Sequence, residues 1–136
     1  MSDVLYEFPP NYKEICERIP AVRKNKAIVF VYAPSIYSPA GIELRPDMLA
    51  HEEVHVTRQG EKPEVWWRRY LTDIDFRLRE ELLAYQTQYK YMNEHYDRAK
   101  RRAILSSIAN DLSGPMYGGI IDRQQAIDLI KNGETI

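Results

Sequence analysis

Two histidines and a glutamate near the middle of the chain have the types and spacing that bind a metal ion and activate water. The segment His51-Glu52-Glu53-Val54-His55 places two imidazoles four residues apart, with a carboxylate directly after the first. Residues four apart lie one above the other on a helix, so both imidazoles can bind one zinc ion. Glu52 is rotated by about 100° from His51, so its carboxylate should lie beside the ion. A general base must lie there to take a proton from a zinc-bound water.

A third ligand is needed, because a catalytic zinc ion normally has three protein ligands and one open position. The only other histidine, His95, lies far along a second predicted helix, where an exposed position is the simpler interpretation. Glu80 and Glu81 are the better candidates, and the helical pattern separates them. Side chains at spacings of three and four form one apolar or aromatic stripe that contains Glu81: Leu78, Glu81, Tyr85, Tyr89, Met92 and Tyr96.

A carboxylate on a buried stripe is costly unless a metal ion or a cationic partner neutralises it. Glu81 is therefore the predicted third ligand, and an ion pair with an arginine is the alternative. Glu80 falls on a different face, where we expect it to be solvated or to support a ligand. Tyr85 lies one turn after Glu81, as a candidate hydrogen-bond donor to the reacting group or, alternatively, as a core tyrosine.

Breakers and capping residues predict the helices that must position this site. Pro46 and Asp47 favour a helix start and Gly60 favours its end, which puts the His-Glu motif inside one helix. A shorter helix is expected over 11–18 and a short helix or a turn over 66–71, and a long helix over 73–102 is followed by another over 103–111. Asp122 and Gln125 form the pattern of a capping box for a last helix that ends at Gly133.

Three short segments, 27–32, 35–37 and 41–44, predict a small antiparallel sheet. The expected fold class is α+β. The segment 35–44 runs directly into the motif helix, so it is the predicted edge at which an extended substrate could pair.

Length and composition place this site in one domain, residues 1–136. The net charge of -1 gives no reason to expect nucleic acid, and the basic run 98–102 is predicted to be a solvated helix face. Cys16 is the only cysteine, so no internal disulfide can form. No signal peptide is recognisable, and the longest apolar run, 27–33, is far shorter than the ~20 residues of a membrane helix. These features predict a soluble, cytoplasmic protein without a membrane partner, and leave the number of subunits open.

With His51, Glu52, His55 and Glu81 in these places, the chain resembles the gluzincins, the thermolysin-like zinc peptidases. In that class a glutamate on the next helix is the third ligand, commonly followed three residues later by a small residue, here Ala84. The tryptophan- and arginine-rich stretch 66–81 is similar to small single-domain gluzincin-like metallopeptidases of bacteriophages and prophages. The resemblance covers residues 27–96 and implies a minimal zincin-like fold, in which the three-stranded sheet packs on the motif helix and the Glu81 helix faces it. It also implies a Zn²⁺ cofactor and a peptide or protein substrate, with the host cytoplasm or the virion as location.

The predicted activity is hydrolysis of a peptide or amide bond. Glu52 would take the proton of the attacking water and pass it to the leaving amine. Two alternatives remain open. The chain could be a non-catalytic structural or interaction protein, such as a virion or assembly component that retains a zinc site; ten Tyr and the adjacent Trp66 and Trp67 offer aromatic anchors for an interface. It could also be a regulatory protease that cleaves a single partner.

Overall fold

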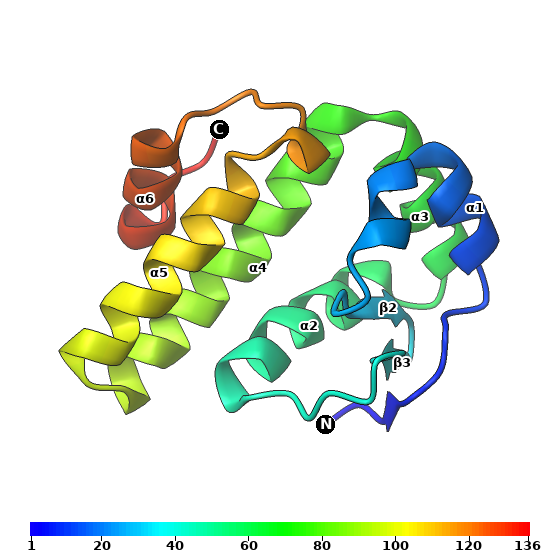
Figure 1. Cartoon of the computed structure of the whole chain (residues 1–136), viewed down its shortest axis with the longest axis horizontal. Coiled ribbons are helices and arrows are strands. Elements are labelled where there is room, and N and C mark those ends of the chain that lie inside the picture. Colours follow the sequence, from blue (N-terminus) through cyan, green and yellow to red (C-terminus); the bar gives the residue numbers. More distant parts are fainter.

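Six helices and one short sheet make up the fold, which is α+β as predicted (Figure 1). The computed structural model describes residues 1–136. The helices are α1 (Tyr12–Arg18), α2 (Pro46–Gln59), α3 (Pro63–Thr72), α4 (Ile74–His95), α5 (Arg98–Leu112) and α6 (Arg123–Asn132), with two 3-10 helices, η1 (Pro20–Lys24) and η2 (Pro115–Tyr117). The strands are β1 (Val4–Leu5), β2 (Phe30–Tyr32) and β3 (Ser35–Tyr37).

Helix α2 lies at the centre of the arrangement. It packs along α4 on one side and against β2 and β3 on the other. Figure 1 shows α4 and α5 running side by side, with α6 beside them, while α1 and α3 lie near the sheet. The fold therefore brings the motif helix and the Glu81 helix together, as the sequence predicted.

The sheet differs from the prediction in two respects. It is mixed, with strand order β1-β3-β2, because β1 pairs in parallel with β3 while β2 pairs with β3 antiparallel. The third strand is β1 rather than the segment 41–44, which forms a loop. The prediction of a substrate-binding edge at 35–44 is wrong, because β1 and β2 cover both sides of β3.

Capping residues placed most helix ends correctly. Pro46 begins α2, and Gly60 ends it with a φ of 57°, a conformation that favours glycine. Asp122 and Gln125 form the predicted capping box of α6. The single long helix predicted over 73–102 is wrong: α4 ends at His95, and the Asp97 side chain accepts a hydrogen bond from the backbone N–H of Lys100 to begin α5.

Two larger apolar clusters flank α2. One joins α4, α5, η2 and α6, and the other joins α1, η1, α3 and the sheet. Trp66 and Trp67 belong to the second cluster and are both buried, so they pack the core instead of offering exposed anchors to a partner. None of the helices combines the length and the apolar character that crossing a membrane requires.

Candidate metal centre

The buried face of α2 is polar, which is unusual for a helix at the centre of a fold. Asp47, His51, His55 and Gln59 recur every fourth residue and are 0%, 7%, 5% and 4% exposed. Such a stripe, called the α2 polar stripe below, is costly to bury unless every group finds a partner. The hydrogen-bond partners of these four side chains therefore indicate the role of the stripe.

At one end of the stripe, Gln59 is satisfied by the sheet. Its amide nitrogen donates to Val31 O at 2.8 Å, and its amide oxygen accepts from Ala33 N at 2.8 Å. The indole of Trp67 also donates to Val31 O. These bonds occupy the outer side of β2 and fix α2 against the sheet.

At the other end, Asp47 accepts hydrogen bonds from three side chains. Arg45 Nε, Tyr96 Oη and Gln88 Nε2 lie 3.0, 2.9 and 2.8 Å from its carboxylate oxygens. Burial alone would raise the pKa of Asp47, but the hydrogen bonds from Arg45, Gln88 and Tyr96 outweigh it and hold the pKa below its usual range. Asp47 is therefore an ionised carboxylate that can only accept hydrogen bonds.

This carboxylate fixes the tautomer of His51. Because Asp47 only accepts, the Gln88 amide must direct its nitrogen to Asp47 and its oxygen to His51. Gln88 Oε1 lies 3.0 Å from His51 Nδ1, so Nδ1 must carry the hydrogen. In the neutral imidazole, Nε2 is then a free lone pair, which is the form that binds a metal ion.

The middle of the α2 polar stripe faces Glu81 on α4. Glu81 Oε1 lies 3.1 Å from both His51 Nε2 and His55 Nε2, and the three atoms lie within 4.8 Å of one another. A zinc ion at ~2.0–2.1 Å from tetrahedral ligands sets neighbouring ligand atoms about 3.3 Å apart. The lone pair of His51 Nε2 faces a carboxylate oxygen at a separation that needs a proton or a cation between them, and His55 Nε2 lies at the same distance. The donor set therefore fits a metal ion.

Glu81 is held in place from its other oxygen. Tyr70 Oη donates to Glu81 Oε2 at 2.7 Å. Burial would raise the pKa of Glu81, but the imidazoles of His55 and His51 outweigh burial and hold it well below its usual range. The pKa of Tyr70 is raised well above its usual value by burial and by the Glu81 charge, so its hydroxyl remains a donor. By contrast, His55 Nδ1 is buried without a hydrogen-bond partner.

Glu80 does not face the imidazoles. It is 3% exposed, and its Oε1 accepts from Arg58 Nε at 2.6 Å and from Trp66 Nε1 at 2.8 Å. The prediction that Glu80 is solvated is therefore wrong, but it does support the site, because the Trp66 ring lies 5.5 Å from the His55 ring. His95 is exposed at the end of α4, away from the centre.

Glu52 and Tyr85 lie beside the three converging side chains. Glu52 Oε1 is 3.6 Å from His51 Nε2, and burial raises the pKa of Glu52 to about 7. The Tyr85 ring lies 4.5 Å from the His51 ring. Burial and then the neighbouring Tyr117 and Glu81 raise the pKa of Tyr85 well above its usual value, so its hydroxyl is a donor at neutral pH. Tyr85 also belongs to the apolar cluster around α4, so both roles considered for it are compatible with its position.

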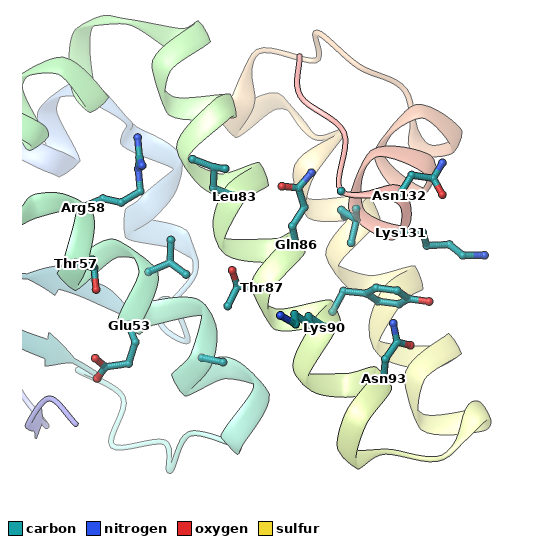
Figure 2. Close-up of a pocket in the computed structure, with 15 residues that line it drawn as sticks. Glu53, Thr57, Arg58, Leu83, Gln86, Thr87, Lys90, Asn93, Lys131 and Asn132 are labelled. Atoms are coloured by element: carbon teal, nitrogen blue, oxygen red, sulfur yellow. The ribbon is translucent and has the colours of Figure 1, made fainter.

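A cleft of about 780 Å³ gives access to these residues. His51, Glu52, His55, Glu81 and Tyr85 line it, together with residues from η1, the approach to β2, the end of α5 and η2. A second hollow, of about 830 Å³, lies between α2, α4 and the end of α6 (Figure 2). Glu53 lines this hollow and not the cleft, and it accepts hydrogen bonds from Ser2.

Sequence reasoning missed two supporting residues, Gln88 and Tyr70, and misjudged a third, Asp47. Gln88 follows Glu81 by seven residues, so helical geometry puts both on one face, but its polar side chain resembles a solvated one. Asp47 lies in the first turn of α2, where an acidic side chain is favourable because of the helix dipole, so its position did not indicate a role in the site. Only its spacing of four from His51 indicated that it could be buried.

No protein-family model matches the chain, and neither a curated protein nor a solved structure does. The chain contains a buried group of two imidazoles and one carboxylate that could hold a metal ion, and this group lines a cleft.

Proposed function

We propose that this chain is a zinc-dependent hydrolase of gluzincin type that cleaves a peptide or amide bond. The observation that carries the proposal is the convergence of His51 Nε2, His55 Nε2 and Glu81 Oε1, with the Glu52 carboxylate beside them. Two imidazoles and one carboxylate form the donor set of catalytic zinc sites.

Two further features favour a reactive site over a structural one. A structural zinc ion usually has four protein ligands, whereas no fourth histidine, cysteine, aspartate or glutamate joins this group. The cleft also reaches the group directly. The alternative of an interaction protein loses one of its supports, because Trp66 and Trp67 are buried.

Several residues of the chain have separate roles in the proposed hydrolysis. Bound zinc would supply Lewis acidity, polarising the substrate carbonyl and acidifying water. Glu52 accepts the proton of the attacking water and donates it to the leaving nitrogen. Tyr85 Oη donates a hydrogen bond to the oxyanion that develops at the substrate carbonyl oxygen. Gln88 and Tyr70 hold the orientations of His51 and Glu81.

An extended substrate has a wall to lie against. Residues 27–31, which lead into β2 and include its first two residues, line the cleft.

The test compares two adjacent glutamates on different faces of α2, since Glu52 lines the cleft and Glu53 lines the second hollow. Glu52→Gln should bind one zinc ion per chain and lose peptide hydrolysis by about 10²-fold or more. Glu53→Gln removes the same charge from outside the cleft and should keep both properties. Zinc content is measured on purified protein, and hydrolysis with a mixture of quenched fluorescent peptides and with unfolded protein substrates.

Two results would contradict the proposal. If the zinc-loaded chain cleaves none of these substrates, a general peptidase is excluded. Cleavage of one specific partner by the wild type, but not by Glu52→Gln, would then identify the regulatory protease considered above. If Glu52→Gln retains full activity, Glu52 is not the base.

A further inference from the structure

Asp111, near the end of α5, is a carboxylate of the cleft that the proposed mechanism does not use. The cleft contains three carboxylates: Glu81 faces the imidazoles, Glu52 lies beside them, and Asp111 belongs to the wall formed by the end of α5 and the turn after it. Asp111 is exposed on one side, and its carboxylate has neither a hydrogen bond nor an ion pair within the chain. An acidic group is thus available to whatever enters the cleft.

The pKa of Asp111 is affected by residues of the metal centre. Partial burial and the Glu81 charge raise the pKa of Asp111, whereas His51 lowers it. Asp111 in turn contributes to the raised pKa values of Tyr85 and Tyr117, two hydroxyls of the same cleft. The Asp111 carboxylate and these groups line one cleft.

No cation of the chain neutralises Asp111. Three arginines line the cleft: Arg18, Arg45 and Arg77. Arg45 is paired with Asp47, and the Arg77 guanidinium donates to backbone carbonyls at the end of α3 and in η2. Arg18 belongs to α1, whereas Asp111 belongs to α5, and the two form no ion pair. The Asp111 carboxylate is therefore free to pair with a cationic group of a molecule that enters the cleft.

On the basis of the proposed function, we infer that Asp111 selects substrates that carry a cationic group, an ammonium or a guanidinium, close to the bond that is cleaved. The cleft provides apolar surface for the stem of such a group, since partly buried Ile28, Val29 and Met116 also line it. A lysine or arginine side chain packs its methylenes on such surface and keeps its charge accessible. A free α-ammonium has the same charge without the stem.

The experiment measures binding without turnover. Zinc-loaded Glu52→Gln protein is titrated with peptides that are identical except for lysine or its uncharged isostere norleucine, each with a free and with an acetylated N-terminus. The cationic peptide should bind about fivefold more tightly than the neutral one, the upper end for a solvent-accessible ion pair. The preference should decrease at high salt. Adding Asp111→Asn should abolish it, whereas adding Asp128→Asn, which removes the same charge from exposed surface on α6, should not.

The four peptides also identify the source of the charge. A preference that follows the lysine supports a basic side chain, and one lost on acetylation supports the α-ammonium. The inference is overturned if Asp111→Asn leaves the preference intact, if it weakens charged and neutral peptides equally, or if none of the peptides binds. Wild-type hydrolysis at equal rates for charged and neutral peptides would refute this inference alone, whereas charge-dependent binding without any wild-type hydrolysis would refute the proposed function alone.

Discussion

Replacing Gln88 by leucine should weaken zinc binding by about tenfold to hundredfold. The substitution removes the acceptor of His51 Nδ1–H and the donor to Asp47, both within the buried part of the fold. In the metal-bound state His51 Nε2 is occupied by the ion, so the hydrogen must stay on Nδ1, now without a partner. A buried unsatisfied donor costs about 1–3 kcal/mol.

The same cost does not apply to the metal-free protein. There the imidazole can move its hydrogen to Nε2 and donate to Glu81 Oε1, which lies 3.1 Å away. The penalty therefore falls on the bound state and lowers affinity by a factor of ten for each 1.4 kcal/mol. This range agrees with the usual effect of removing a hydrogen-bond partner of a metal-bound histidine.

Zinc affinity is measured by competition with a chromophoric chelator, and the Co²⁺ absorption spectrum reports the ligand geometry. The matched control is Gln86→Leu, two residues away on α4, which removes hydrogen bonds to Leu129 O and Glu134 O but none to the metal centre. The reasoning is refuted if folded Gln88→Leu binds zinc within about twofold of the wild type. Equal losses in both variants would refute it as well.

Three further predictions follow from the same network. Glu81→Gln should abolish stoichiometric zinc binding. Glu80→Gln should keep the metal but lower thermal stability, because Glu80 pairs with Arg58 and the Trp66 indole. Metal analysis and melting curves would contradict this prediction if Glu80→Gln, and not Glu81→Gln, lost the metal. Tyr70→Phe should weaken zinc binding by roughly tenfold, since it removes a hydrogen bond to a buried charged carboxylate, and unchanged affinity in the chelator competition would show that Tyr70 does not position Glu81. The pKa of Asp47 is lowered in the folded protein, so the stability that Asp47 contributes should be present above its unfolded pKa of about 3.9 and disappear as the pH falls through the folded pKa. The unfolding free energies of wild type and Asp47→Asn should therefore converge below about pH 4. A difference between them that stays constant with pH would exclude this linkage.

Local signals in the sequence predicted much of the helical frame. Pro46, Gly60 and the Asp122–Gln125 capping box act through backbone geometry within a few residues, so they needed no tertiary information. The grouping of His51, His55 and Glu81 was also accessible, because helical periodicity places a charged side chain on an otherwise apolar stripe.

The remaining features depend on contacts between distant segments. Strand β1 has only two residues, and it becomes a strand because Val4 pairs with Ile36. The break between α4 and α5 has no glycine or proline, so only the capping capacity of Asp97 could have indicated it. The interaction of Asp47 with Gln88 joins residues 41 positions apart, which no local pattern encodes.

The short distance between His55 on α2 and Glu81 on α4 has a consequence for α3. An ion shared by His55 and Glu81 would join residues 26 positions apart and act as a cross-link around the segment that contains α3. Binding would then stabilise the folded state and tighten α3 against its neighbours. Trp66 stacks within that segment and lies against His55, so its intrinsic fluorescence should change as metal is titrated in, giving an optical record of occupancy that needs neither substrate nor label.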